Sequence, residues 1–569
     1  MSQRLNDAAG RLRRALLAVA ATAVLATGLP HASAAPLPAQ AAIASAHPLA
    51  TQAGLDVLAR GGNAFDAAIA VGAVLGVVEP ASSGLGGGAF FLLHVAAADR
   101  DVLIDARESA PGAARRDMYI DAAGKPRENA SRDGPLAAAI PGEAAGWAWL
   151  AQHYGRLPLA ASLAPAIRIA REGFPLYARL QTAIRVKRER LAASPDAAAV
   201  FLTGGEPPAV GSVIRQPALA ATLELIATRG AQAFYRGPFA ERLVAALRHD
   251  GGIWTVADLA AYHVIERAPV RFKYRDATLV AAGPPSSGGI ALGDALNILA
   301  GYDLASLDAD TRRHLVIEAL RRAFRDRAEY LGDPDFVPIP VEQLLSPAYA
   351  AGQRDSIRLD RATPSATLRP AFVSPEGPST THFSVLDREG NGVATTQSVN
   401  LFFGATWMAP GTGVLLNDTM DDFSVGAGVP NAFQLVGAEA NAIAPGKRPL
   451  SSMTPTFVTT AAGELIIGSP GGSTIISNVL GGVLGWLAGA SAVQIVAAPR
   501  IHHQYQPDVV LLEPGALAPA ERAALEKRGH VLRDSSRAWG NTQVVTWDFA
   551  SGRVEAASDP RGVGAGLVY

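Results

Sequence analysis

The sequence predicts an α+β fold with a single layered core that both halves of the chain build together. The region up to about residue 330 is dominated by helical periodicity, whereas the region from Thr380 onward is rich in short β segments. Neither half provides both a sheet and the helices to cover it, so one shared core is the economical arrangement. A length of 569 residues would by itself favour about four domains, but this change in texture favours one core, and there is no internal repeat.

The first half is predicted to open with helices and then add strands. A helical pattern through Leu58 stops at Gly61-Gly62, and Asn63–Val78 follows as an Ala/Val-rich helix. That helix has no charge after Asp66, which predicts burial on all sides. Strands and amphipathic helices are expected through residue 330: strands at Phe90–Val95, Val102–Asp105, Val270–Tyr274 and Thr278–Ala282, and helices that include Leu219–Ala227, Phe239–Arg248 and His314–Tyr330.

Prolines make residues 338–379 a loop-rich connector, and the chain turns to β structure after it. A hairpin is predicted from Thr380–Asp387 and Val393–Asn400, which flank the turn signal Arg388–Gly392. A glycine-broken apolar stretch near Val479–Leu487 is predicted to be a buried helix. Further strands are expected at Val414–Leu416, Thr456–Thr459, Leu465–Gly468, Val509–Leu512, Gln543–Trp547 and Val554–Ala557.

The N-terminus has the pattern of a secretory signal peptide over residues 1–34. Arginines precede the apolar run Ala15–Leu29, and Ala32-Ser33-Ala34 is an A-x-A cleavage site. The run is too short and too Ala-rich to favour a transmembrane helix, and no later segment has the density of a membrane span. We therefore expect cleavage after Ala34 and a periplasmic or secreted protein without a membrane span.

Composition and spacing exclude several kinds of chemistry. Charge is balanced, with 50 Lys+Arg against 51 Asp+Glu, which disfavours a nucleic-acid partner. The absence of cysteine excludes disulfides, thiolate metal sites and a Cys nucleophile. Gly84–Gly88 lacks the continuation of a phosphate-binding loop, so tight backbone packing at a turn is favoured. His502-His503 lacks metalloprotease spacing, so a structural role is favoured and no metal is expected.

Thr380 begins the first clear strand of the second half, and two interpretations of it are open. One is an ordinary β-branched strand residue. The other is that cleavage before Thr380 makes it an N-terminus, whose free α-amine accepts the proton as the hydroxyl attacks a carbonyl. An α-amine has a reference pKa of about 7.7–8.0 and acts as a base near neutral pH. One residue would then supply nucleophile and base, and the chemistry would need no cofactor.

Polar residues at the ends of nearby strands favour the chemical interpretation. A carboxylate, an amide, hydroxyls and a Gly-Gly turn together would make a pocket for an amino-acid group with an oxyanion hole. The guanidinium fork of Arg107 could pair with a substrate carboxylate. The other residues concerned are Asn400, Asp421-Asp422, Ser451-Ser452 and Ser469–Ser473.

With these residues in place, the sequence resembles the gamma-glutamyltransferase (gamma-glutamyltranspeptidase) family from about Ala44 to Tyr569. The landmarks occur in the family's order over nearly the whole mature chain. They are Gly61–Ala68, Gly84–Gly88, Arg107-Glu108, Pro284–Gly289, Tyr330–Pro334, Thr380–His382, Met420–Phe423, Arg448–Met453, Gly468–Gly472, Pro499–Gln504 and Ser558–Arg561.

The resemblance implies an N-terminal-nucleophile hydrolase with a four-layer αββα sandwich. A precursor would cleave itself between Ser379 and Thr380 into a large chain, 35–379, and a small chain, 380–569, which would stay together as a heterodimer. Thr380 would then attack the γ-glutamyl amide of glutathione or a similar donor. The acyl-enzyme would pass the glutamyl group to water, or to an amino acid or peptide. The implied function is a periplasmic glutathione hydrolase with gamma-glutamyltransferase activity.

The resemblance also implies a role for each site residue. By analogy with the family, the backbone N–H groups of Gly471 and Gly472 form the oxyanion hole. Ser398, where bacterial members commonly have Thr, keeps the hydroxyl that bonds the nucleophile. The glutamyl α-carboxylate would be held by Arg107, Ser451 and Ser452, and the α-amine by Asn400 and Asp422.

Two positions depart further from the family pattern. Position 419 is Thr, where the family usually has Gln or Glu helping to bind the α-amine, and this shorter, neutral side chain bears on γ-glutamyl affinity. Phe433 stands where some members place a Tyr in a lid over the pocket. The segment Val425–Asn441 is long enough to be that lid.

Two rival functions stay open. A cephalosporin or glutaryl acylase shares the nucleophile but accepts acyl chains that lack the α-amine. Thr419 keeps that option open, whereas Asp422, Asn400 and Arg107 argue for a glutamyl group. A non-catalytic periplasmic binding protein is the other rival, and it would show no self-cleavage.

Overall fold

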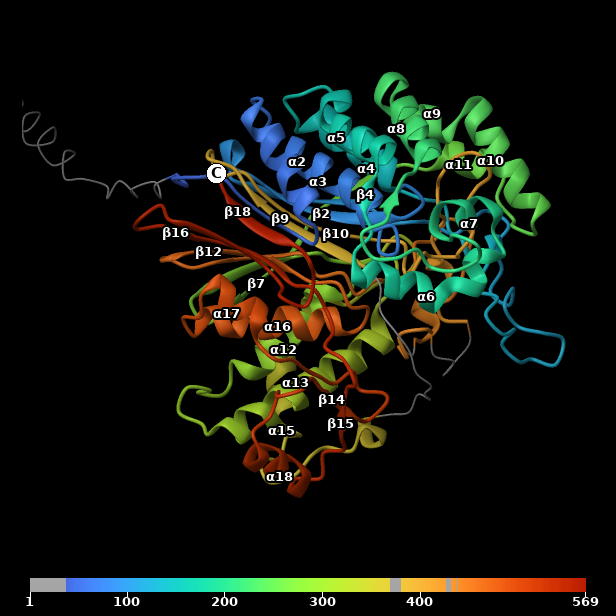
Figure 1. Ribbon diagram of the computed structural model, residues 1–569. Helices are drawn as coiled ribbons and strands as arrows, with labels where there is room; N and C mark the ends of the chain where they lie inside the picture. The colour runs from blue at the N-terminus through green and yellow to red at the C-terminus, as the bar shows by residue number, and fades with distance from the viewer. Residues whose placement is uncertain (1–36, 369–379, 426–430, 436) are drawn as a thin grey trace, which may run out of the picture. The chain divides into compact units, whose positions relative to one another are not determined.

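Two antiparallel sheets lie face to face in the computed structural model, and helices cover their outer faces (Figure 1). The structure describes residues 37–368, 380–425, 431–435 and 437–569, and Leu37–Tyr569 forms one unit. The predicted signal peptide, residues 1–34, and Ser379 lie outside the described residues. The order helix, sheet, sheet, helix confirms the predicted α+β fold and its four-layer αββα sandwich.

The seven-stranded sheet mixes strands from both halves of the chain. Its two central strands, β9 and β10, are the predicted hairpin, and each pairs on its other side with a strand from the first half. In order across the sheet, the strands are β18 (Ala565–Val568), β1 (Ala42–Ser45), β9 (Thr381–Leu386), β10 (Gly392–Ser398), β2 (Gly88–Val95), β3 (Arg100–Ala106) and β6 (Ile265–Arg267).

The six-stranded sheet is shared in the same way. Its strand β11 pairs with β8 from the first half, so neither half could form this sheet alone. In order, its strands are β17 (Val554–Ser558), β16 (Gln543–Asp548), β12 (Gly463–Gly468), β11 (Thr456–Thr459), β8 (Ala277–Ala281) and β7 (Val270–Tyr274). Smaller pairings involve β13 (Ile501–His502), β14 (Val510–Leu512) and β15 (Leu532–Asp534), and also β4 (Phe174–Pro175) and β5 (Val213–Ile214).

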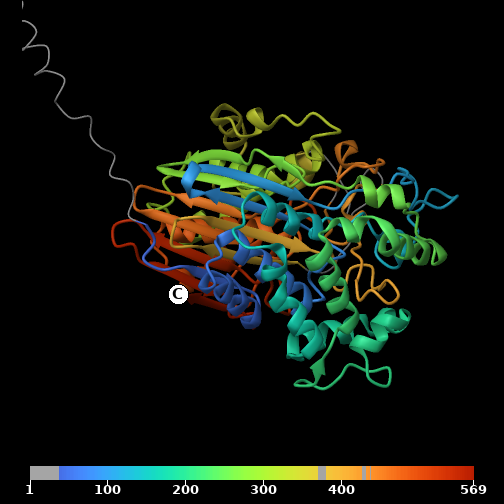
Figure 2. The same ribbon diagram turned by 90° about the horizontal axis from the view of Figure 1, so that it is seen from above.

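Helices of the first half cover the seven-stranded sheet, as the view from above shows (Figure 2). They are α2 (Pro48–Ala59), α3 (Ala64–Val78) and α4 (Glu143–His153), and α5 (Leu159–Glu172) packs on α3. The six-stranded sheet is covered by α12 (Gly288–Leu299), α16 (Thr474–Leu487) and α17 (Ala492–Ala497), and α13 (Ala309–Tyr330) packs on α12. The remaining helices are α6 (Ala178–Ala192), α7 (Pro195–Phe201), α8 (Pro217–Arg229), α9 (Gln232–Tyr235), α10 (Gly237–His249), α11 (Val256–Ala261), α14 (Val341–Leu344), α15 (Pro347–Asp355) and α18 (Pro519–Lys527).

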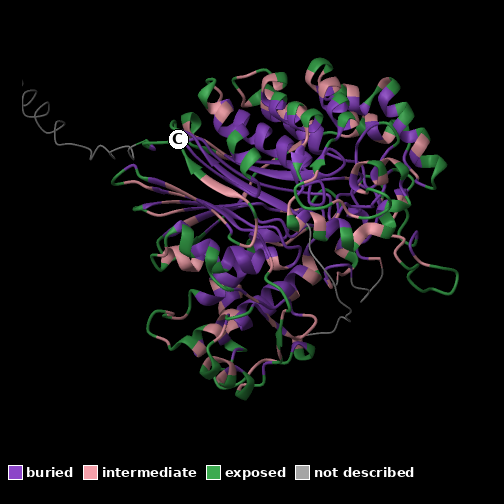
Figure 3. Cartoon of the chain, in the orientation of Figure 1, coloured by how far each residue is buried: buried purple, intermediate pink, exposed green. Residues whose placement is uncertain are grey.

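Helix α3 is buried along its whole length, as its composition predicted (Figure 3). Its N-terminus is fixed by a capping box, in which the Asn63 side chain accepts from the Asp66 N–H and the Asp66 carboxylate accepts from the Asn63 N–H. The helix contacts α2, α5 and the central strands β9 and β10. Because α3 has packed neighbours on all sides, apolar residues are suited to all of its faces.

Several predicted elements differ in the structure. Val414–Leu416 is not a ladder strand, because Leu415 and Leu416 form only isolated bridges. The predicted connector contains the helices α14 and α15; Pro340 and Pro347 lie at their N-terminal ends, where proline costs no hydrogen bond. Helix α16 includes the predicted Val479–Leu487, but its last turn is only half-buried. Within the described part of the chain, no helix is both long and apolar enough to cross a membrane.

Candidate active site

Thr380 lies directly before β9, where the hairpin places it beside the end of β10. The pairing of Thr381 with Gln397 sets this register. The Thr380 hydroxyl oxygen lies 3.0 Å from that of Ser398, and Ser398 Oγ also accepts a 2.8 Å hydrogen bond from the Asn400 N–H. Thr380 is 6% exposed. The predicted nucleophile and its predicted hydroxyl partner are therefore in hydrogen-bond contact.

Arg107 extends from the end of β3 into the same region and is buried. Its Nε donates to the Pro449 carbonyl at 3.2 Å, and its two terminal nitrogens donate to Glu108 at 3.1 Å and to Asp422 at 2.5 Å. Three acceptors fix the plane of the guanidinium, so its orientation is set before any ligand enters.

Asp422 is the acidic group of the site. Burial raises its pKa to about 6, although the adjacent Arg107 opposes that shift. The Asn431 amide donates to its other oxygen at 3.4 Å. Near neutral pH the group is a carboxylate that can accept a hydrogen bond from an ammonium group.

These side chains line one small cavity. The lining includes most of the site residues that the sequence analysis selected: Arg107, Thr380, Ser398, Asn400, Asp422, Ser451, Ser452 and Gly472. It also includes Phe433, the position at which some family members place a Tyr, and five residues that were not selected: Arg327, Leu435, Leu450, Met453 and Ile475. The cavity wall therefore combines the Thr380 hydroxyl with two guanidinium groups, one carboxylate and several apolar side chains.

The glycine turn after β12 forms another part of the wall. Gly471 and Gly472 have φ angles of 139° and 56°, which favour glycine. A Cβ on Gly472 would lie 2.2 Å from the ring of Phe433, so only glycine allows this ring to close on the turn. Gly471 does not line the cavity itself, but it precedes Gly472 in the same turn.

The Ser451-Ser452 pair is held by the turn at Pro284–Gly289. The Ser451 N–H donates to the Pro285 carbonyl at 2.8 Å, and the Ser287 N–H donates to the Ser451 carbonyl at 2.8 Å. This turn leads directly into α12, whose N-cap residue is Ser287. The motif thus joins the first half of the chain to the serine pair of the second half.

Asn400 and Thr419 take different positions relative to the cavity. Asn400 lines it with a φ of 79°, and its amide donates to the Asp418 carbonyl at 3.1 Å. Thr419 is fully buried outside the lining, and its hydroxyl donates to Glu108 at 2.8 Å. Glu108 in turn contacts Arg107. The structure therefore connects Thr419 to the cavity through other side chains.

The glycine-rich segment Gly84–Gly88 packs as closely as predicted. A Cβ on Gly86 would lie 1.9 Å from the Leu415 carbonyl oxygen, and one on Gly87 would lie 2.1 Å from that of Ser398. The backbone of this segment therefore lies against the backbone of Leu415 and Ser398, and there is no room for a side chain at Gly86 or Gly87.

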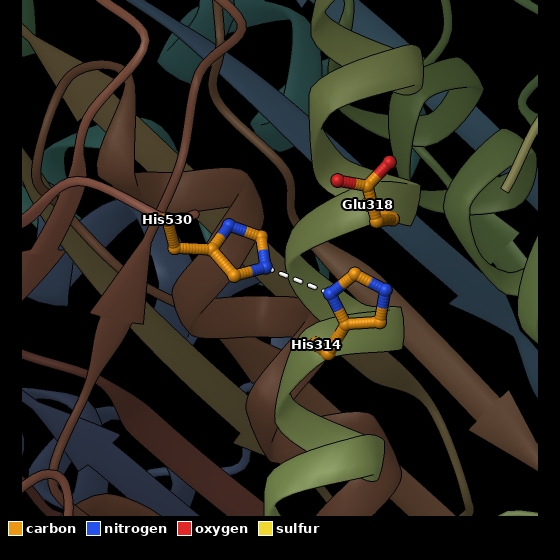
Figure 4. A group of neighbouring side chains, drawn as sticks. All are labelled: His314, Glu318 and His530. Carbon is orange, nitrogen blue, oxygen red and sulfur yellow. Dashed lines mark hydrogen bonds between the residues drawn. The ribbon is translucent and has the colours of Figure 1, made fainter. Parts of the chain in front are cut away.

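Three side chains outside this site could each offer one ligand atom to a metal ion: His314, Glu318 and His530 (Figure 4). His314 Nδ1 and His530 Nε2 lie 2.7 Å apart in a hydrogen bond. Glu318 pairs with the guanidinium groups of Arg321 and Arg322. Because these two positive charges oppose the approach of a cation, we assign the cluster a structural role between α13 and the segment after α18.

Arg327 is the charged lining residue that the sequence analysis missed. It occupies the buried face of α13 with Phe324 and Leu320, which lie three and seven positions earlier. A guanidinium on the apolar face of an amphipathic helix was the available signal, since such a charge needs a buried partner or a ligand.

Comparisons with known proteins agree with this geometry. A sequence model of Gamma-glutamyltranspeptidase matches residues 50–569. The chain is 41% identical over 531 residues to the glutathione hydrolase proenzyme of Escherichia coli (strain K12), covering 92% of this chain and 91% of that protein. It is 37% identical over 514 residues to the Acylase ACY 1 proenzyme of Pseudomonas sp. (strain V22), covering 88% and 89%. The solved cephalosporin acylase from Bacillus halodurans matches with a TM-score of 0.81 and 30% identity, covering 95% of this chain and 98% of that one.

Proposed function

Because the chain belongs to the gamma-glutamyltranspeptidase family, we propose that it is a periplasmic glutathione hydrolase and gamma-glutamyltransferase with Thr380 as nucleophile. The observation that carries the proposal is the Thr380 hydroxyl, 3.0 Å from Ser398 at the wall of the cavity. The similar protein of Escherichia coli is named a glutathione hydrolase proenzyme, which supports both the activity and a processed precursor.

Self-cleavage creates the active form in this proposal. The Thr380 hydroxyl attacks the carbonyl carbon of Ser379, and the peptide nitrogen leaves as the Thr380 amine, so that an ester replaces the amide. Water then hydrolyses the ester. The products are a large chain, 35–379, and a small chain, 380–569. They remain one heterodimer because each sheet contains strands of both chains that are hydrogen-bonded to one another.

The new α-amine acts as the base for turnover. It accepts the hydroxyl proton as Thr380 attacks the γ-carbonyl of the donor, and the Ser398 hydroxyl orients the attacking oxygen. Backbone N–H groups at Gly471 and Gly472 stabilise the oxyanion. The protonated amine then gives its proton to the nitrogen of the donor amide. That nitrogen departs as a free amine, and the glutamyl group remains as an ester on Thr380. Water takes the glutamyl group in hydrolysis, and an amino acid or peptide amine takes it in transfer.

Recognition of the glutamyl group uses two sets of residues in the cavity, one for its α-ammonium group and one for its α-carboxylate. Asp422 and Asn400 hold the α-ammonium group, and Arg107 with Ser451 and Ser452 holds the α-carboxylate. We propose that Thr419 contributes to this recognition indirectly, since its hydroxyl contacts Glu108, the neighbour of Arg107.

An acylase that prefers glutaryl chains is the second candidate. A glutaryl group is a γ-glutamyl group without its α-amine. A comparison of glutaryl and γ-glutamyl substrates therefore tests only the contacts to the α-amine. Thr419 lies outside the cavity lining, which removes one family contact to the amine. The fold similarity to a cephalosporin acylase supports the same candidate. Asp422, which lines the cavity as a carboxylate near neutral pH, favours the glutamyl donor.

Rates of p-nitroaniline release from γ-glutamyl-p-nitroanilide and glutaryl-p-nitroanilide separate the two candidates. We expect a higher kcat/KM for the γ-glutamyl compound, and a preference for the glutaryl compound would favour the acylase. Thr380→Ala is the control for release by other routes. Fractionation of cells that express the chain with and without residues 1–34 tests the periplasmic assignment.

A further inference from the structure

Arg327 places an additional positive charge at the wall of the cavity. It lies near the C-terminal end of α13, is 4% exposed and lines the same cavity as Thr380 and Arg107. Burial lowers its pKa to about 10. The guanidinium therefore remains protonated at neutral pH.

No carboxylate of the described residues forms an ion pair with this guanidinium. Within residues 37–368, 380–425, 431–435 and 437–569, no Asp or Glu oxygen lies within 4.0 Å of the charged nitrogens of Arg327. Asp422 attracts it only at longer range. Other buried arginines do have carboxylate partners: Arg107, Arg448 and Arg500. Since a buried charge without a partner is costly, an anionic group in the cavity would relieve that cost.

The hydrogen bonds of Arg327 go to two serine hydroxyls. Its Nε donates to Ser287 Oγ at 3.0 Å, and a terminal nitrogen donates to Ser452 Oγ at 3.3 Å. The Ser452 hydroxyl oxygen thus accepts a hydrogen bond from Arg327, and no acceptor among the described residues receives the hydroxyl hydrogen. That hydrogen is left for a ligand in the cavity, which Ser452 lines.

Ser287 extends the same arrangement to the neighbouring serine. Its N–H and its hydroxyl both donate to the Ser451 carbonyl, at 2.8 and 2.6 Å. Arg327 and the turn at Pro284–Gly289 together fix the orientation of Ser451-Ser452. The turn at Pro284–Gly289 and Arg327, neither of which takes part in the acyl-transfer steps, thus both contact the serine pair.

We infer that Arg327 is a positioning residue for the α-carboxylate of the donor. It turns the Ser452 hydroxyl hydrogen toward that carboxylate and supplies a positive charge that the carboxylate neutralises. The identity of the donor rests on the proposed function, but the recognition of a distal carboxylate does not. A ligand with such a carboxylate should depend on Arg327, and a ligand with only the amine should not.

Two small amides that differ in this one feature provide the test. Glutaramate carries the carboxylate and no amine, and 4-aminobutanamide carries the amine and no carboxylate. Their dissociation constants are measured by calorimetry on the purified full protein and on Arg327→Met. We expect glutaramate to bind about ten- to a hundredfold more weakly to the variant, the loss of a charge-assisted contact. Binding of 4-aminobutanamide should change by less than about threefold.

Arg312→Met is the matched control, because Arg312 lies exposed on the same helix. It should leave both dissociation constants unchanged.

Three results would overturn the inference. Equal weakening of the binding of both amides by Arg327→Met would show a merely structural role. Unchanged glutaramate binding by the variant, or failure of the wild type to bind glutaramate, would also contradict it. If Arg327→Met does not fold, Ser287→Ala removes an acceptor of Arg327 and should weaken glutaramate selectively. If glutaramate binding depends on Arg327 but γ-glutamyl-p-nitroanilide is not hydrolysed, the proposed function fails and the inference stands.

Discussion

Arg107 and Asp422 form a buried ion pair in the wall of the cavity, with a terminal nitrogen of Arg107 2.5 Å from a carboxylate oxygen of Asp422. In the structure each of these two groups is a hydrogen-bond partner of the other. A donor that carries both a carboxylate and an ammonium group would offer a partner to each. The pair is thus suited to an amino-acid group and is held in place before that group binds.

The acidity of Asp422 predicts a pH step in binding. Its pKa is raised to about 6, so the carboxylate is present above that pH and is lost as pH falls below it. An ammonium group needs the carboxylate, so inhibition by L-glutamate should weaken about tenfold per pH unit below 6. Glutarate lacks the ammonium group and should show no such step. Comparing the two inhibition constants cancels the titration of the Thr380 amine, and parallel pH profiles would refute the role of Asp422.

The contact between Thr380 and Ser398 predicts an effect on kcat. Ser398→Ala removes the hydroxyl that lies 3.0 Å from that of Thr380, the proposed nucleophile. Loss of one such hydrogen bond should lower kcat about tenfold with little change in KM. Ser398→Thr keeps the hydroxyl and should retain most of the activity. Steady-state kinetics on γ-glutamyl-p-nitroanilide checks both variants. A kcat for Ser398→Ala equal to that of the wild type would be inconsistent with this role.

Packing of His382 in β9 against Gly468 predicts an effect on the stability of the fold. A Cβ on Gly468 would lie 2.2 Å from the His382 ring, which is itself held by a 2.8 Å hydrogen bond to Thr396. Gly468→Ala should therefore destabilise the protein by about 1–3 kcal/mol and lower its melting temperature. Gly481→Ala in α16 is the matched control, since nothing lies within 4 Å of the added Cβ there. Equal melting temperatures for the two variants would argue against the close contact.

Buried histidines predict a loss of stability in mild acid. Burial lowers the pKa of His502 to about 4 and that of His382 to about 3, and it acts most strongly among the causes that lower the pKa of His530 to about 3. The unfolded chain takes up protons below the reference pKa of about 6.5, whereas the folded chain does not. Stability is thus complete above that pH, and each histidine costs about 1.4 kcal/mol per pH unit below it until its folded pKa is reached.

Melting temperatures between pH 7.5 and 5 check this expectation. They should fall steadily below about pH 6.5. His530→Gln should flatten the decline because it removes one of the contributing groups. A melting temperature that stays constant over the whole interval would contradict the assignment of neutral, buried histidines.

Much of the fold could be predicted because its elements have strong local patterns. The Ala/Val-rich run Asn63–Val78, with no charge after Asp66, and the hairpin signal at Arg388–Gly392 each had one reasonable interpretation, and both are confirmed. The edge strand β18 and its neighbour β1 were missed because they are short and rich in small residues, so only their pairing, Ile43 with Leu567, reveals them. Periodicity does not record such long-range pairing.

The candidate site was only partly accessible from sequence for the same reason. Thr380, Arg107 and Asp422 belong to motifs at strand ends, and the structure brings them to one cavity. Arg327 was missed because its helical pattern predicts a buried face but not what that face contacts. The position of Thr419 behind Glu108 likewise depends on how β3 meets the segment after β10.

The central claim is that the chain is cut before Thr380 and that this residue then acts as nucleophile. N-terminal sequencing of the bands from a denaturing gel of the purified protein tests it most directly. We predict two bands, the smaller beginning Thr380-Thr381-His382, and a single band for Thr380→Ala. A single wild-type band close to the mass of the whole chain, in protein that is folded, would contradict the account.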